Sequence, residues 1–179
     1  NSHFIDKDNS RKLAASKFRK ILVSLDGITE ETYNSYRVNG DLKKVLSGIE
    51  LLGTELKKQG KSKKLELQVL VNSYNEGELE GIKEYGRRLG LKVVFKSMQI
   101  IGSTDTDGFL PGESSYRRYS LVKGSLRIRS TLPGYCYRLW TNPVITWYGK
   151  VLPCCFDKDA NYVLGDINKQ SIKEIWMGS

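Results

Sequence analysis

The residues best suited to chemistry in this chain are its three cysteines, Cys136, Cys154 and Cys155. Between them, a strand-like run at 144–147 meets a turn at Tyr148-Gly149 and a short second run at 150–152, which predicts a β-hairpin. A hairpin would bring Cys136 close to Cys154 and Cys155. Thiolates gathered on a tight turn are typical ligands of zinc and of iron–sulfur clusters. The segment therefore predicts a metal site with these three cysteines as candidate ligands.

The number of cysteines leaves the metal open at this point. Structural zinc takes four ligands, and three cysteines without a nearby histidine do not complete such a site. Iron–sulfur clusters also usually take four thiolates, so a further ligand is needed. Neighbouring side chains of an extended segment point in opposite directions, so Cys155 has an alternative role as a small buried residue beside the ligand Cys154.

Composition limits the class of protein. The chain has 179 residues, 39% of them hydrophobic, and a net charge of +9. The lysines of segment 57–64 predict a solvated loop rather than a nucleic-acid surface, because no aromatic residues are interleaved with them, although an anionic substrate or partner remains open. The polar start 1–10 is no signal peptide, and no apolar run approaches the roughly 20 residues of a membrane span. An odd number of cysteines indicates a reducing, cytoplasmic location.

Strands and helices are predicted to alternate along the first half of the chain. Compact apolar runs at 21–25, 65–71 and 91–95 predict strands. Between them, residues 42–56 show apolar positions at helical spacing, and a second helix is predicted to end at Gly90. This order predicts βαβ units and a parallel sheet, and strands this apolar are expected where both faces of a sheet are covered.

The sequence also indicates where two helices begin. Gly40 and Asp41 open the long helix. Asn75, with Glu78 three residues later, predicts an N-cap with a capping-box partner for the next helix.

The carboxyl ends of parallel strands form one rim of a sheet, where ligands bind. This rule places Ser24, Asp26, Asn72 and the pair Met98-Gln99 along one rim. The polar segment 102–118 is expected to loop over it. Residues 121–130 are expected to contain another strand, and residues 171–176 the start of a helix.

Two groups of motifs resemble one known family. Residues 21–27, Ile-Leu-Val-Ser-Leu-Asp-Gly, followed by Glu31-Thr32-Tyr33 and Arg37, resemble the mid-barrel segment of radical S-adenosylmethionine (radical SAM) enzymes. In the second group, Cys136, twelve residues, Gly149, four residues and Cys154 resemble the opening of the SPASM domain that follows the barrel in some of these enzymes. Residues 153–155, Pro-Cys-Cys, residues 164–167, Leu-Gly-Asp-Ile, and the helix start at 171–176 agree with that pattern.

The resemblance implies an α/β fold made of part of a (β/α) barrel, followed by a small SPASM-like hairpin and helix. It implies that residues 1–103 are the C-terminal part of the barrel, 104–130 a connection with the last barrel elements, and 131–179 the N-terminal part of an auxiliary iron–sulfur domain. The cysteine triplet with C-x-x-x-C-x-x-C spacing that holds the catalytic [4Fe–4S] cluster in this family is absent, since no cysteine precedes Cys136. The chain is therefore expected to be a fragment that is inactive alone and contains no catalytic residue.

The resemblance also implies cofactors and partners for the parent protein. These are S-adenosylmethionine (SAM), a [4Fe–4S] cluster in the barrel and an auxiliary cluster bound by Cys136, Cys154 and Cys155. The parent would be an oxidoreductase or modifying enzyme that cleaves SAM reductively and acts on a peptide, a protein or a small molecule. An electron donor protein is expected as a partner, whereas a membrane and nucleic acid are not. The alternative is a non-catalytic α/β interaction module with a zinc- or thiol-stabilised hairpin.

Four residues are implied to bind the cofactor. Ser24 and Arg37 would reach SAM. Arg37 would bind the carboxylate of SAM by a two-pronged contact. The alternative for Ser24 is a hydroxyl satisfied within the sheet, and for Arg37 a surface salt bridge with Glu30 or Glu31. Asp26 and Asn72 have structural alternatives as well, the first in shaping the turn after the strand and the second in capping the next turn.

Overall fold

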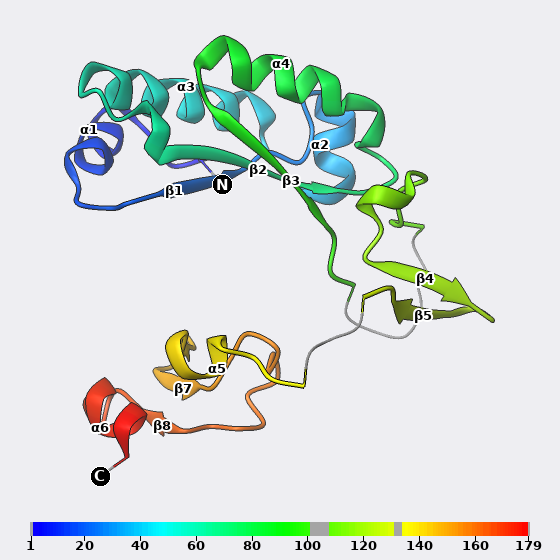
Figure 1. Cartoon of the computed structure of the whole chain (residues 1–179). Coiled ribbons are helices and arrows are strands. Elements are labelled where there is room, and N and C mark those ends of the chain that lie inside the picture. The colour runs from blue at the N-terminus through cyan, green and yellow to red at the C-terminus, as the bar shows by residue number, and fades with distance from the viewer. Residues whose placement is uncertain (1, 101–107, 131–133, 179) are drawn as a thin grey trace. The chain divides into compact units, whose positions relative to one another are not determined.

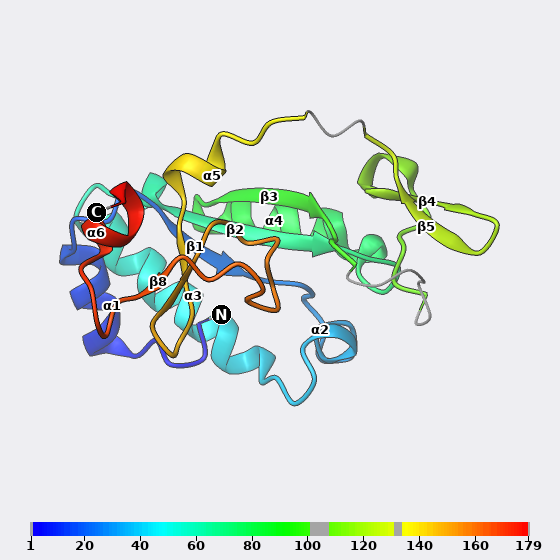
Figure 2. The same cartoon turned by 90° about the horizontal axis from the view of Figure 1, so that it is seen from below.

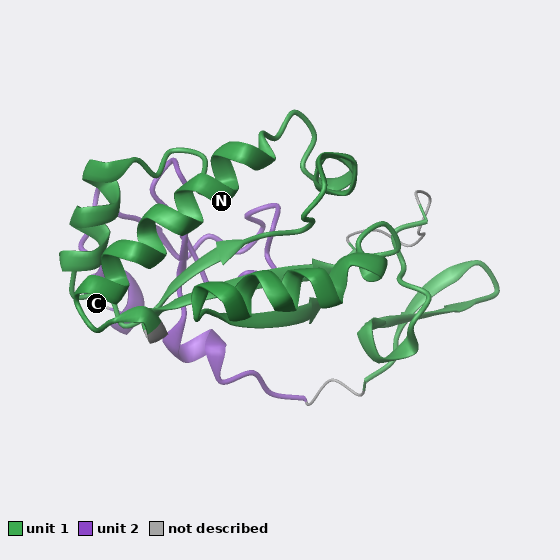
Figure 3. Ribbon diagram, turned by 90° about the horizontal axis from the view of Figure 1, so that it is seen from above, with its two compact units in different colours: residues 1–130 green, residues 131–179 purple. Residues whose placement is uncertain are grey.

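The computed structural model describes residues 2–100, 108–130 and 134–178. The chain forms two compact units, residues 1–130 and residues 131–179 (Figure 3). The second unit begins where the auxiliary domain was expected to begin. The expected boundary between residues 103 and 104 lies outside the described residues.

Unit 1 is an α/β unit around a parallel sheet. Strands β1 (Ile21–Ser24), β2 (Leu65–Val71) and β3 (Lys92–Ser97) pair in parallel in that order (Figure 2). The helices are α1 (Lys7–Ala15), α2 (Glu30–Tyr36), α3 (Leu42–Lys58) and α4 (Leu79–Leu89), and single turns of 3₁₀ helix lie at Ser62–Lys64, Glu76–Glu78 and Ser114–Tyr116. In Figure 1, α1, α3 and α4 lie on one side of the sheet. The predicted α/β class and parallel strands are confirmed, whereas three strands in the described residues do not make a barrel.

The core lies between the sheet and these helices. Alternate residues of β2, namely Leu65, Leu67, Val69 and Val71, are fully buried and belong to one apolar cluster. The helices contribute their own apolar positions to the same cluster, listed here: Leu42, Val45, Ile49, Leu52 and Leu56 from α3, and Leu79, Ile82 and Tyr85 from α4. The helical spacing read from the sequence therefore places α3 correctly, with Asp41 as its N-cap accepting from the Lys44 amide.

The opposite face of the sheet is more polar than expected. Leu22, Glu66 and Lys92 are register partners across the three strands, as are Ser24, Gln68 and Val94. Leu22 is 51% exposed. Helices of unit 1 thus cover one face only, and the expectation of strands apolar on both faces is wrong. Runs such as Leu-Glu-Leu-Gln alternate with period two, as in a sheet with one covered face.

A second antiparallel hairpin follows in unit 1. Strands β4 (Tyr119–Val122) and β5 (Ser125–Ile128) pair around Lys123 and Gly124, whose φ angles are 51° and 77°. Two consecutive positive φ values are typical of a tight two-residue hairpin turn, and glycine adopts them without steric cost. The sequence predicted one strand over 121–130, and the structure has a hairpin that begins earlier.

Unit 2 is a small three-stranded antiparallel sheet with two short helices. It contains α5 (Arg138–Thr141), β6 (Val144–Ile145), β7 (Lys150–Leu152), β8 (Gly165–Asp166) and α6 (Ile172–Met177). Pairing of Val144 with Leu152 and of Ile145 with Val151 confirms the predicted hairpin and its turn. Strand β8 was not predicted, because two residues are too short a run to recognise as a strand.

The described helices differ from a helix that spans a membrane. None of them combines the length and apolar character that crossing a bilayer takes.

Candidate functional site

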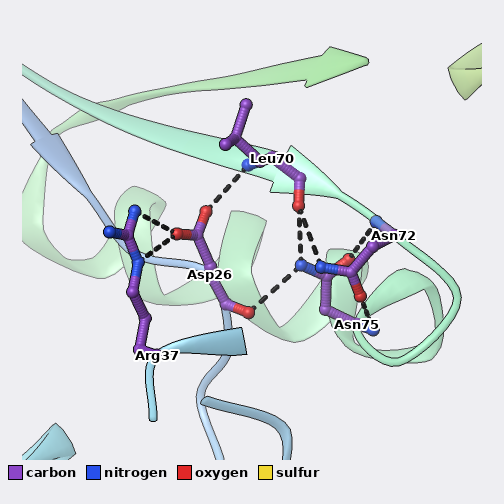
Figure 4. Close-up of polar contacts among 5 residues, drawn as sticks. All are labelled: Asp26, Arg37, Leu70, Asn72 and Asn75. Atoms are coloured by element: carbon purple, nitrogen blue, oxygen red, sulfur yellow. Dashed lines mark hydrogen bonds and ion pairs between the residues drawn. The ribbon is translucent and has the colours of Figure 1, made fainter. Parts of the chain in front are cut away.

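Asp26 is the central polar residue at the carboxyl ends of the strands (Figure 4). It is fully buried, just after β1. Its Oδ2 atom accepts from Nε of Arg37 at 2.8 Å and lies 2.6 Å from Nη2, while Oδ1 accepts from the Leu70 amide of β2 at 2.8 Å. One carboxylate thus joins the end of β1, the end of α2 and strand β2. The expected alternative, a salt bridge of Arg37 with Glu30 or Glu31, is wrong, because the buried carboxylate is the nearer partner.

Asn72 and Asn75 continue this network after β2. Both are fully buried. The Asn72 side-chain oxygen accepts from the amides of Tyr74 and Asn75 at 2.9 and 3.1 Å, so it caps the turn as the sequence suggested. The Asn75 side-chain amide donates to the carbonyls of Asp26 and Leu70 at 3.1 and 2.9 Å. We call the set Ser24, Asp26, Arg37, Asn72 and Asn75 the carboxyl-end rim.

The capping box predicted for Asn75 and Glu78 is wrong. Helix α4 begins at Leu79 without a side-chain cap, because the Asn75 side chain is used between the strands. Glu78 instead reaches the loop after β1, where its carboxylate accepts from the Ile28 amide at 2.7 Å and from the Thr29 hydroxyl at 2.6 Å. Both residues connect elements far apart in sequence, which a local motif cannot indicate.

Ser24 differs from its neighbours in the rim. It ends β1, opposite Gln68 of β2, on the face away from the helices. Among the described residues its hydroxyl has no hydrogen-bond partner, and the same holds for Nη1 of Arg37, whose side chain is 31% exposed. The expected alternative of a Ser24 hydroxyl satisfied within the sheet is therefore not found. The rim has two groups left to bind a ligand, a hydroxyl and a guanidinium N–H.

The chain returns to this rim after residue 107. The Ser73 hydroxyl donates to the Gly108 carbonyl at 2.6 Å, and the Ser73 amide donates to the Phe109 carbonyl at 3.2 Å. The Phe109 ring packs edge-on against Tyr36 and Tyr74, with ring centroids 6.2 and 5.3 Å apart. This part of the expected loop over the rim is confirmed, and residues 101–107 lie outside the described residues, whereas Met98-Gln99 follows directly after β3.

The three cysteines lie at the two ends of the unit 2 hairpin segment. Cys136 precedes α5, and its carbonyl accepts from the Leu139 amide at 3.1 Å. Cys154 follows β7 and is half-buried, whereas Cys136 and Cys155 are exposed, and all three are free thiols. No group of three or more histidine, cysteine or acidic side chains in the described residues is arranged to hold a metal. Their role as ligands stays a prediction.

The donor set nevertheless has the chemistry of an iron–sulfur ligand set. Three thiols in one short segment are soft ligands, and none is consumed in a disulfide. Three is one fewer than a cluster usually takes, so a cluster held here would need at least one ligand in addition to these cysteines.

Gly149 fixes the turn of the hairpin. Its φ is +88°, and a Cβ there would collide with the Asn168 side-chain nitrogen. That nitrogen donates to the Tyr148 carbonyl and to Asp166 Oδ1, both at 2.9 Å. Asp166 Oδ1 also accepts from the Asn168 backbone N–H at 2.9 Å, and Asp166 lies 3.0 Å from the Lys150 ammonium. These contacts, led by the hydrogen bond from the Asn168 backbone N–H, lower the pKa of Asp166. Sequence reasoning missed Asn168, although an asparagine two residues after an aspartate is a common turn signal.

Comparison with known proteins assigns the second unit. Residues 136–179 match the family model of SPASM, the iron-sulfur cluster-binding domain. This segment belongs to the SPASM family. Its cysteines, Gly149 and residues 164–167 are the features that the sequence motif had indicated, so the predicted resemblance is confirmed in this part of the chain.

The fold of the whole chain is similar to that of solved radical SAM enzymes with a SPASM domain. Native anSMEcpe with bound AdoMet, an anaerobic sulfatase-maturating enzyme, aligns with a TM-score of 0.63 and 19% identity over 98% of this chain and 54% of that chain. The same protein with bound AdoMet and Kp18Cys peptide aligns with a TM-score of 0.57, and with AdoMet and Cp18Cys peptide with 0.59, both at 17% identity over 98% of this chain and 55% of theirs. These identities establish likeness of fold alone. The chain spans about half the length of the proteins it matches.

No curated protein matches the chain closely enough to establish a relationship.

Proposed function

We propose that this chain is part of a radical SAM oxidoreductase or modifying enzyme that cleaves SAM reductively and acts on a peptide or another substrate. The proposal rests on a sequence match and a structural alignment taken together. A SPASM segment at 136–179 follows a parallel α/β unit, and the two together align over 98% of the chain with an AdoMet-bound enzyme of this kind.

The rim supports a SAM contact through two of its residues. Ser24 offers a hydroxyl and Arg37 a guanidinium N–H, both without a partner among the described residues. Such groups suit the carboxylate and hydroxyls of an amino acid or nucleoside ligand. Both carboxylate oxygens of Asp26 are engaged by Arg37 and Leu70, so we assign Asp26 and Asn72 the task of positioning these donors.

The cysteines support an auxiliary cluster. We assign Cys136 and Cys154 as ligands, with Cys155 as the third candidate, and infer that further ligands come from outside these three residues. When bound, a [4Fe–4S] cluster supplies or relays electrons, and the cluster that cleaves SAM would belong to a segment with the C-x-x-x-C-x-x-C motif. The chain by itself would then be inactive. An electron donor protein and a reducing, cytoplasmic location follow from the same chemistry.

Iron analysis of the complete gene product, purified without oxygen, tests the ligand assignment. Iron and sulfide should fall by the content of one cluster in Cys136→Ala and in Cys154→Ala. Tyr162→Phe, an exposed position of the same unit, serves as the control and should keep the full content. Unchanged iron in both cysteine variants would refute the assignment, and loss of iron in Cys155→Ala would add that residue to the ligands.

SAM binding tests the rim. Equilibrium dialysis with the complete gene product should give about tenfold weaker SAM binding for Ser24→Ala, the value expected from one lost hydrogen bond to a charged group. Ser47→Ala is the matched control, because Ser47 is exposed on α3, among residues of the helix that face solvent. Equal affinity in the two variants would contradict the role of Ser24.

A further inference from the structure

A pocket lined by cationic side chains lies in unit 1, beside the carboxyl end of β3. Its volume is about 480 Å³, and it is lined by Lys96, Ser97, Arg117, Arg118, Arg129 and Ser130. The residues come from β3, from the segment before β4 and from the segment after β5. The pocket therefore depends on the fold of unit 1, and it is separate from the residues of the carboxyl-end rim.

No acidic side chain among the described residues lines this pocket. None of the four cations, Lys96, Arg117, Arg118 and Arg129, forms a salt bridge with a carboxylate in the part of the chain that the structure describes. Elsewhere in unit 1, cations such as Lys12 and Arg87 have acidic partners on their own helices. Like charges gathered without a counter-charge repel one another, so an anion in this pocket would be stabilised by all four.

Two of the three arginines are held in place by backbone groups. Arg117 donates through Nε to the Pro111 carbonyl, at 2.5 Å, and Arg129 donates through Nη1 to the Ser114 carbonyl. Each guanidinium retains further N–H donors, because arginine has five. These contacts fix the direction of the side chains without neutralising them.

Arg118 provides an independent observation. Its Nε atom is buried and has no hydrogen-bond partner. A buried N–H donor without a partner costs free energy, and in native proteins such groups generally bind water or a ligand. An oxyanion would supply the missing acceptor.

We propose that this pocket binds a tetrahedral oxyanion of the phosphate type, carried by a small molecule. Three guanidinium groups suit a phosphoryl group, because the planar fork of arginine matches two oxygens at once. The hydroxyls of Ser97 and Ser130 offer two more donors. The volume of the pocket accommodates a diphosphate. The proposal is independent of a cluster or of SAM.

Calorimetric titration of the 179-residue chain with inorganic pyrophosphate tests this site. We expect binding that weakens about tenfold in Lys96→Gln and in Arg118→Gln, as for the loss of one charge-assisted contact. Lys57→Gln removes the same charge from an exposed position of α3 and should bind as the parent chain does. Lys96→Gln covers the case in which Arg118→Gln fails to fold, because Lys96 is exposed on β3.

Three results would overturn the proposal. One is equal weakening in Lys57→Gln, which would indicate a response to net charge alone. Another is citrate binding as tightly as pyrophosphate, which would exclude preference for the tetrahedral group. The third is binding of a single-stranded oligonucleotide that requires Lys96 and Arg118, together with no binding of pyrophosphate. This result would make the pocket a nucleic-acid contact.

Discussion

The carboxyl-end rim of unit 1 and the cysteine hairpin of unit 2 hold their reactive groups in contrasting ways. In the rim, Asp26 is fully buried and both its oxygens are bonded to other parts of the protein. In unit 2, Cys136 and Cys155 are exposed, and no protein group is arranged around them as a ligand shell in the described residues. The Asp26 carboxylate is thus fully bonded within the protein, whereas the cysteines of the hairpin have no such bonded environment in the described residues.

The difference follows from the size of each core. Unit 1 buries apolar residues from two strands and four helices in one cluster, and partly buried residues of β3 pack against it. Unit 2 buries few large apolar side chains, Val151 and Leu152 of β7, so tight turns and caps contribute a larger share of its stability. All three tryptophans, Trp140, Trp147 and Trp176, lie in unit 2, while the longest helices lie in unit 1. Fluorescence and far-UV circular dichroism therefore report on the two units separately.

The largest expected effect is that of Asp26→Ala. Removing the carboxylate leaves Arg37 and the Leu70 amide without their partner, and we expect unit 1 to lose about 3 kcal/mol of stability, as when one member of a buried ion pair is removed. Urea unfolding followed by circular dichroism measures it. Asp8→Ala, in an exposed pair with Lys12, should cost under about 1 kcal/mol. Similar costs for the two variants would mean that the rim is not held by Asp26.

The next effect is that of Gly149→Ala on unit 2. A positive φ disfavours alanine by about 1–2 kcal/mol, and the added Cβ collides with Asn168. The tryptophan fluorescence transition in urea should move to lower urea, while the circular dichroism transition keeps its midpoint. Gly53→Ala, in open space within α3, is the control and should not destabilise the chain. An unshifted fluorescence transition in Gly149→Ala would show that the turn does not limit the stability of unit 2.

A smaller effect is expected at the start of α6. Ser171 and Glu174 form a capping box, in which the Ser171 hydroxyl accepts from the Glu174 amide at 3.2 Å and the Glu174 carboxylate accepts from the Ser171 amide at 2.8 Å. Ser171→Ala should cost about 1 kcal/mol, measured by the fluorescence of Trp176 on the same helix. Ser171→Asp retains an acceptor and should recover most of the loss. If it recovers none, the cap is not the cause.

The smallest expected effect is a pH dependence of unit 2. The pKa of Asp166 is lowered in the folded state, first by the hydrogen bond from the Asn168 backbone N–H and then by that from Lys150. Its contribution to stability is therefore present above the ordinary carboxyl pKa of about 4, and it is lost as the pH falls through the lower, folded value. The fluorescence transition in urea should move to lower urea on acidification, and less so in Asp166→Asn. An identical pH profile for the variant would contradict this assignment.

The sequence predicted those features that depend on neighbouring residues. The apolar spacing of α3, the start of α3 after Asp41, the end of α4 at Gly90 and the hairpin around Gly149 are each specified within a few positions. Gly90 has a φ of +68°, as a helix-ending glycine does.

Features that depend on distant residues were not predictable in the same way. Asn75 was expected to cap a helix and instead bonds to Asp26 and Leu70, because the strand ends lie close only in the folded chain. Arg37 was assigned to the cofactor, with Glu30 or Glu31 as alternative partners, and it pairs with a buried carboxylate eleven positions earlier. In the candidate site the sequence could therefore name Ser24, Asp26, Arg37 and Asn72, but it could not divide them into residues that hold the rim and residues left to bind.

The bridge from Asn75 to the ends of β1 and β2 has a consequence for ligand recognition. The Asn75 side-chain amide bonds to the carbonyls of both Asp26 and Leu70 without the help of a ligand, so the ends of the two strands are preorganised. A molecule arriving there meets a rigid surface, and little conformational entropy of these tips is lost when it docks.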